Sequence, residues 1–156
     1  MKALQSLTDL FLSSVTDPTN VELWAEDGSL ICTQGSEIDG FELFYTVHVA
    51  LSEVDVSPEV LMMHLVNWLN KFDPLRGEKG LKEPTFASQL LDGGMIDLKL
   101  LIDIQEPYVL EVAQNGKWER DGTRFDCVSG LEAVVAEYEL DTLQYVGGHE
   151  GDLPCP

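Results

Sequence analysis

FELFYTVHVALSE, at residues 41–53, decides the fold, because apolar and more polar side chains alternate along most of it. A period of two is typical of a β-strand that turns one face to a core. The face expected in the core carries Phe41, Leu43, Tyr45, Val47, Val49 and Leu51. The stretch therefore predicts a long strand with one buried side.

A helix is predicted directly after this strand, from Pro58 to about Phe72. Ser57 can cap its N-terminus, and Pro58 takes the first helical position, where a missing N–H removes no hydrogen bond. The apolar stripe recurs at helical spacing and comprises Leu61, Leu65, Trp68 and Phe72. We expect it to pack on the sheet face that carries Val47, Val49, Leu98 and Leu100.

Upstream of residue 41, the sequence predicts a helix and then a hairpin. The helix has an apolar stripe made by Leu4, Leu7, Phe11 and Val15. Asp17-Pro18 ends it. Residues 21–33, VELWAEDGSLICT, contain two short apolar runs around Asp27-Gly28, a dipeptide that two-residue hairpin turns favour.

Downstream of the second helix, the sequence predicts a loop and two more hairpins. PLRGEKGLKEP, at residues 74–84, reads as a mobile surface loop because of its glycines, prolines and charges. Residues 85–105 form a predicted hairpin around Asp92-Gly93-Gly94. Residues 108–122 form another around Asn115-Gly116, since Asn-Gly is the strongest short hairpin signal.

These elements favour an α+β fold, with two main helices packed on one sheet that is mostly antiparallel or mixed. A short helix is expected at 131–138. We expect residues 1–146 to form a single domain, since 156 residues fit one core. Residues 147–156, GGHEGDLPCP, are expected to form a flexible C-terminal tail.

The overall charge excludes one class of partner. The chain has 28 acidic and 9 basic residues, and a net charge of -19. Nucleic-acid binding through phosphates requires a basic footprint that this chain lacks. No apolar run approaches the roughly 20 residues that span a bilayer, so no membrane is expected. The three scattered cysteines, Cys32, Cys127 and Cys155, form no disulfide framework and fit a reducing cytosol.

The basic residues are the first candidates for a functional surface, because all but one lie in residues 71–124. Four crowd the glycine-rich loop: Lys71, Arg76, Lys79 and Lys82. Arg120 and Arg124 follow the last predicted hairpin. Two interpretations stay open. These residues are ordinary solubilising charges, or they form a basic patch that meets an acidic patch on another copy.

The tryptophans are the second candidates, because large aromatic side chains anchor interfaces. Trp68 lies in the apolar stripe of a helix and is expected to be buried. Trp24 and Trp118 lie beside predicted turns, and each fits a core edge as well as a contact surface.

The sequence points to no catalytic residue, no cofactor and no metal site. Its three histidines, His48, His64 and His149, lie in no nucleophile or metal motif. Acid pairs such as Glu53 and Asp55 could hold a cation, but chance pairs are expected among 28 acidic residues. We therefore expect a protein that is not an enzyme.

The order of these segments resembles the tail completion protein R family of contractile-tailed temperate phages. The resemblance rests on VELWAEDGSLICT, FELFYTVHVALSEVD, a helix ending VNWLNKFDP, and EKGLKEPTFASQLLDGGMIDLKLLIDI. In that family a Trp-Leu near the helix end precedes a Pro, and a charged Gly-Lys loop follows. The match covers roughly residues 1 to 120, and the acidic region 125–156 has no counterpart in it.

The resemblance implies a structural protein that completes the phage tail and makes it competent to join the head. By analogy with tail terminators, it implies a ring of subunits, six by expectation, at the head-proximal tail end. Its partners would be copies of itself, the tail tube, the sheath and a second completion protein. It would assemble in the host cytoplasm and reside in the virion tail. The alternative is an acidic binding module or inhibitor that acts on a basic partner.

Overall fold

The computed structural model describes residues 1–32, 38–131 and 143–147. In chain order its elements are α1 (Lys2–Ser14), β1 (Val21–Ile31), β2 (Gly40–Val54), α2 (Pro58–Phe72), β3 (Thr85–Leu90), β4 (Ile96–Val112), β5 (Trp118–Arg120) and β6 (Thr123–Ser129). Short 3-10 turns occur at Pro18–Asn20 and Asp92–Gly94. No helix in the described ranges has the length and apolar character needed to cross a membrane.

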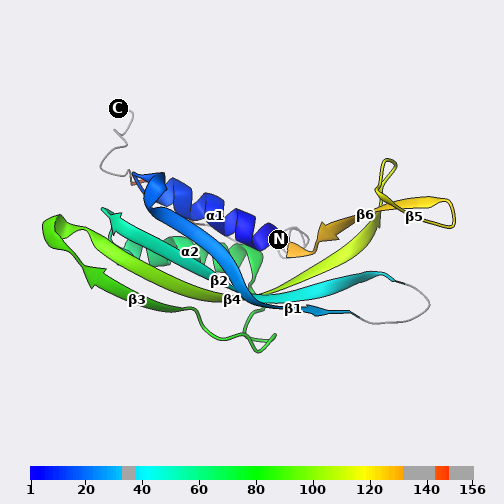
Figure 1. Cartoon of the computed structure of the whole chain (residues 1–156), viewed down its shortest axis with the longest axis horizontal. Coiled ribbons are helices and arrows are strands. Elements are labelled where there is room, and N and C mark those ends of the chain that lie inside the picture. Colours follow the sequence, from blue (N-terminus) through cyan, green and yellow to red (C-terminus); the bar gives the residue numbers. More distant parts are fainter. Residues whose placement is uncertain (33–37, 132–142, 148–156) are drawn as a thin grey trace.

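The six strands form one sheet in which every pair is antiparallel. The hydrogen-bonded order is β1-β2-β4-β6-β5, and β3 also pairs with β4. β4 has 17 residues, so it is long enough to pair with two strands along one edge. β3 pairs with its first part and β6 with its last part, and β2 pairs along the opposite edge. Figure 1 shows α1 and α2 over one end of the sheet, with β5 and β6 projecting from the other. The predicted α+β fold is confirmed.

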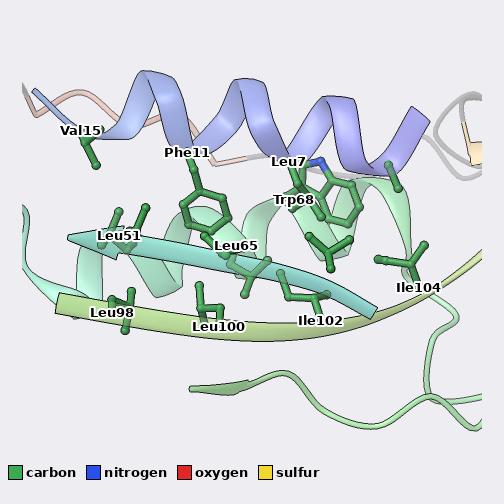
Figure 2. Packing of buried hydrophobic residues seen from close by; sticks show 14 of the residues in the cluster. Leu7, Phe11, Val15, Leu51, Leu65, Trp68, Leu98, Leu100, Ile102 and Ile104 are labelled. Atoms are coloured by element: carbon green, nitrogen blue, oxygen red, sulfur yellow. The ribbon is translucent and has the colours of Figure 1, made fainter. Parts of the chain in front are cut away.

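The core lies between the two helices and one face of the sheet. Val47 pairs with Ile102, and Val49 with Leu100, so the alternating side chains of both strands share that face. Leu7 and Phe11 of α1 join the same cluster (Figure 2). Leu61, Leu65 and Trp68 of α2 also belong to it, which confirms the predicted packing of this helix. Trp68 is 5% exposed.

The hairpin predicted at residues 21–33 is wrong, because β1 is a single strand that pairs with β2 from Val21 to Ile31. The register shifts between Glu26 and Ser29, where two residues of β1 oppose one residue of β2. Asp27 has a φ of 54°, so Asp27-Gly28 forms a β-bulge in place of a turn. The bulge lets β1 pair with β2 on both sides of Asp27-Gly28, whereas a hairpin turn at this point would end the strand.

The hairpin predicted around Asn115-Gly116 is also wrong. β4 continues to Val112 and pairs with β6, and β6 pairs with β5. The turn of this last hairpin is Asp121-Gly122, where both φ values are positive, 51° and 79°, as a type I′ turn requires. By contrast, the hairpin predicted at residues 85–105 is confirmed as β3 and β4.

Two terminal predictions fall on parts of the chain that are not described. The predicted helix at 131–138 lies outside the described residues, apart from Leu131. The predicted tail at 147–156 also lies outside them, apart from Gly147.

Candidate functional site

Part of the sheet extends past the N-terminus of α1, and no described helix covers it (Figure 1). We call this part the distal sheet and define it as residues 38–42, 107–113 and 118–129. Alternate residues of β4 face the core, and this series continues from Ile104 and Glu106 to Leu110 and Val112 in the distal sheet. Val112 is 74% exposed. The distal sheet therefore presents to solvent the same face that is buried under the helices.

A groove of about 440 Å³ lies in the distal sheet. Phe41, Leu110, Trp118 and Phe125 are among the residues that line it. Arg120 closes one side. It donates a hydrogen bond of 2.9 Å to the carbonyl oxygen of Ile38, and its guanidinium lies 5.3 Å from the centre of the Phe125 ring. Exposed aromatic and arginine side chains around an apolar groove are typical of protein interfaces.

Glu106 is fully buried at the root of the distal sheet. Its Oε1 accepts hydrogen bonds from the backbone N–H groups of Lys2, at 2.8 Å, and Ala3, at 3.2 Å. These groups belong to the first turn of α1, which has no side-chain cap of its own. A helix N-terminus has unpaired N–H donors and a partial positive charge, so this carboxylate caps α1 from a strand.

Three hydroxyl groups also donate to Glu106. The Tyr45 hydroxyl lies 2.5 Å from Oε2, while Tyr108 and Ser129 each lie 3.0 Å from Oε1. Burial, followed by the hydrogen bond to Glu106, raises the pKa of Tyr45 well above its usual value. Burial likewise raises the pKa of Tyr108 to about 12, with the nearby Glu106 carboxylate adding to the effect. Glu106 therefore joins α1, β2, β4 and β6 at one point.

The predicted basic loop is held in place by ion pairs and is not uniformly at the surface. Arg76 is only 8% exposed. Its Nη1 lies 2.8 Å from Asp73 Oδ2, and Lys79 Nζ lies 2.7 Å from Asp73 Oδ1. Arg76 also donates to the carbonyl oxygens of Lys82, at 2.6 Å, and Asp103, at 3.1 Å. The expectation of an exposed Arg76 is thus wrong, because this side chain fastens the loop to β4.

The remaining candidate residues lie in different places. Lys71 and Lys82 flank this loop, and Lys71 Nζ lies 5.3 Å from the centre of the Phe72 ring. Arg120 and Arg124 belong to the distal sheet, with Arg124 Nε 3.7 Å from a Glu119 carboxylate oxygen. The structure therefore does not bring the predicted basic residues together into one patch.

Trp118 and Trp24 are both exposed, at 63% and 38%. Trp118 lies in the distal groove, whereas Trp24 lies on the sheet face opposite the helices, where it stacks on His48 at a ring distance of 5.2 Å. Trp24 Nε1 donates to Glu26 Oε1 at 2.9 Å, and His48 Nε2 lies 3.2 Å from Glu26 Oε2. Within the described ranges, Glu26, Asp27 and His48 are the one group whose ligand atoms lie within 4.8 Å of one another.

The strand β3 forms an outer edge of the sheet, and all six of its residues are exposed. Its sequence, TFASQL, contains no charged residue and no proline. Phe86 is 62% exposed and Leu90 is 76% exposed, although both point to the helix side of the sheet. The helices do not bury them.

Sequence reasoning missed Glu106 and Asp73, the two acidic side chains around which the candidate surfaces are organised. A signal for Glu106 existed: it continues the core-facing series Ile96, Leu98, Leu100, Ile102 and Ile104. No comparable signal marked Asp73, because its partners, Arg76 and Lys79, read as solvated charges.

Comparisons with known proteins place the chain in a phage protein family. The model of the family described as P2 phage tail completion protein R (GpR) matches residues 1–125. The chain is also similar to a protein of Haemophilus phage HP1 (strain HP1c1), described as an uncharacterized 19.2 kDa protein in the rep-hol intergenic region. The two are 28% identical over 132 residues, which cover 80% of this chain and 78% of the relative. No solved structure matches significantly. This chain belongs to the P2 phage tail completion protein R (GpR) family, a family of structural phage tail proteins.

Proposed function

We propose that this protein completes the phage tail as a ring of subunits at the head-proximal end and makes the tail competent to join the head. Six copies is the expected number. The observation that carries the proposal is the distal sheet, where a core-type face with Trp118 and Val112 remains exposed in the single chain. An exposed apolar surface of this kind is typical of a protein–protein contact site.

The partners follow from the same surface. The tail tube, the sheath and a second completion protein are the candidates that would cover the distal sheet once the ring has formed. Lys71, Lys82, Arg120 and Arg124 would supply the charge that lets a protein of net charge -19 attract acidic neighbours. Assembly would take place in the host cytoplasm.

Complementation tests this function. Particles made without the protein are mixed with purified protein, and head-joined particles are counted by electron microscopy and by plaque titre. Trp118→Glu is expected to reduce joining at least tenfold, because it places a charge in the apolar groove. Val66→Glu is the matched control, since Val66 is also exposed, at 55%, but lies on α2.

Two results would contradict the proposal in different ways. If particles lacking the protein already join heads normally, the protein does not complete tails. If Trp118→Glu joins as well as the wild type, the distal sheet is not the assembly surface. The alternative of an acidic binding module, which the net charge favours, predicts a monomer that binds a basic protein outside the tail.

A further inference from the structure

The sheet has two outer edges that lie on opposite sides of its four central strands. These strands run in the order β1-β2-β4-β3. One outer edge is β3, at Thr85–Leu90. The other is β1, and within the described residues no strand pairs with its outer side. An unpaired edge offers a row of N–H and C=O groups to another strand.

The β3 edge lacks the features that normally block such pairing. Edge strands are commonly protected by charged side chains, proline or bulges. β3 has no charge and no proline, and it pairs with β4 from Thr85 to Leu90 without a register shift. Phe86 and Leu90 add exposed apolar surface to the unpaired backbone.

The β1 edge matches β3 in length. Its regular part runs from Val21 to Glu26 and ends at the bulge, so it also contains six residues. The flanking charge is acidic: Asp17, Glu22, Glu26 and Asp27 lie at or near this edge, and no basic residue lies between residues 16 and 31. β3 itself is uncharged, so it places no acidic side chain opposite Glu22 or Glu26; the exposed pair Lys82 and Glu83 precedes it.

Strand direction allows the two edges to meet. Neighbours alternate in direction through the four strands, so β1 and β3 are antiparallel to each other. Rotation about an axis roughly parallel to the strands preserves each direction. The β1 edge of the next copy would therefore arrive antiparallel to β3, with the same face of the sheet on the same side.

The side chains also fit when residues 85–90 of one copy lie fully alongside residues 21–26 of the next copy. Leu90 then lies opposite Val21, Gln89 opposite Glu22, and Ala87 opposite Trp24. Core-side residues meet core-side residues, since Leu90 pairs with Ile96 and Val21 pairs with Leu51 within one chain. The large indole of Trp24 meets the small side chain of Ala87.

We propose that β3 of one copy pairs antiparallel with residues 21–26 of β1 in the next copy, which joins the sheets of neighbouring subunits head to tail. The occupant is a second copy of this chain. A symmetric β3-to-β3 contact is less favourable for a ring, because it joins only two copies and leaves both β1 edges unpaired. This contact rests on the proposed ring and specifies which surfaces close it.

Cross-linking with single cysteines tests the contact. Cys32, Cys127 and Cys155 are first replaced by serine, and Gln89→Cys and Glu22→Cys are made separately in that background. A short bismaleimide is added to each variant and to their mixture, both in concentrated protein at raised salt and in purified tails. We expect a covalent dimer in the mixture only. Val66→Cys mixed with Glu22→Cys is the matched control and should give none, because Val66 is exposed on α2, away from both edges.

Each other outcome overturns the contact. A dimer from Gln89→Cys alone would establish the symmetric pairing, and no dimer in the mixture under either condition would exclude the proposed one. Completed, head-joined tails without this cross-link would leave the proposed function standing while refuting the contact. A second measurement guards against a poorly placed cysteine. Phe86→Glu should weaken self-association at least tenfold with unchanged circular dichroism, whereas Val66→Glu, at an exposed residue of α2, should not.

Discussion

Glu106 accepts hydrogen bonds from five donors, and those from Ala3 and Tyr45 are fully buried. Lys2 and Ala3 of α1, Tyr45 of β2 and Ser129 of β6 all depend on it. Glu106→Leu removes this acceptor from the buried Ala3 N–H and the buried Tyr45 hydroxyl. We expect it to lower the free energy of unfolding by about 3 kcal/mol or more.

Urea denaturation measures this loss. Glu111→Leu is the matched control, because Glu111 lies in the same strand and is exposed. Its effect should stay within about 0.5 kcal/mol, as for most surface positions. Equal losses in the two variants would show that the capping of α1 by Glu106 contributes little.

The two tyrosines around Glu106 predict a loss of stability at alkaline pH. The pKa of Tyr108 is about 12 in the folded protein and about 10 in an unfolded chain. A raised folded pKa favours folding fully below pH 10, and the stabilisation is lost as pH rises through about 12. Tyr45 shifts in the same direction.

Ultraviolet titration checks this prediction. Absorbance of tyrosinate near 295 nm should rise in two stages, with Tyr45 and Tyr108 ionising last and together with unfolding. Tyr108→Phe should remove part of the late stage. Complete ionisation of all four tyrosines near pH 10 in the folded protein would contradict it.

Arg76 and Lys82 carry the same charge but should respond differently to substitution. Arg76→Glu places a second acid beside Asp73, which is only 3% exposed. Breaking a buried ion pair typically costs about 3 to 5 kcal/mol, so this variant should unfold easily or not fold. Lys82→Glu changes an exposed residue and should shift the melting temperature by no more than about a few degrees. Similar melting temperatures for the two would show that the Asp73 ion pairs are dispensable.

At the level of elements, α2 was predicted with its observed limits, because a proline at its start and an amphipathic stripe agree locally; the Ser57 side chain makes no capping hydrogen bond. The strands were predicted less well. The same dipeptide, Asp-Gly, forms a bulge at residues 27–28 and a hairpin turn at residues 121–122. The difference comes from β2, whose long partner edge holds β1 together through the bulge. Such tertiary pairing leaves no trace in a local dipeptide.

The packing of α2 on the sheet predicts the effect of Trp68→Ala. Trp68 is 5% exposed, and its Nε1 donates to Ser6 Oγ of α1 at 2.9 Å, so the side chain joins both helices to the sheet. Removing it should cost about 3 to 5 kcal/mol in denaturant melts. Trp118→Ala, at a side chain that is 63% exposed, is the control and should cost under about 1 kcal/mol. A small effect at Trp68 would mean that α2 packs less tightly than the cluster implies.

For the whole molecule, the candidate surfaces were harder to predict than the fold. The periodicities of 2 and 3.6 indicated which faces are buried, but not where the helices stop covering the sheet. For Trp118 the sequence left a core edge and a contact surface open, and only its pairing with Phe125 of β6 places it in the exposed distal groove. The sequence placed Arg76 among the surface charges, whereas in the structure Arg76 is buried and pairs with Asp73. Both outcomes depend on long-range contacts.

The net charge of -19 leads to a prediction about cations. Mutual repulsion among acidic side chains is screened by any salt, so added salt should raise the melting temperature modestly. Ca²⁺, Mg²⁺ or a chelator should add nothing at matched ionic strength, because Glu26 is already engaged by Trp24 and the cluster with Asp27 and His48 offers only three ligand groups. A specific shift of many degrees in thermal melts, lost in His48→Ala, would reveal a metal site.

The bulge at Asp27-Gly28 also bears on how unassembled copies survive in a crowded cell. β1 is 11 residues long, and a straight free edge of that length would be a template for fibre-like aggregation. The bulge twists the backbone after the first six residues and interrupts the flat edge. The flat part of the β1 edge is therefore shorter than the strand itself, which reduces the backbone available for non-specific strand addition to unassembled copies.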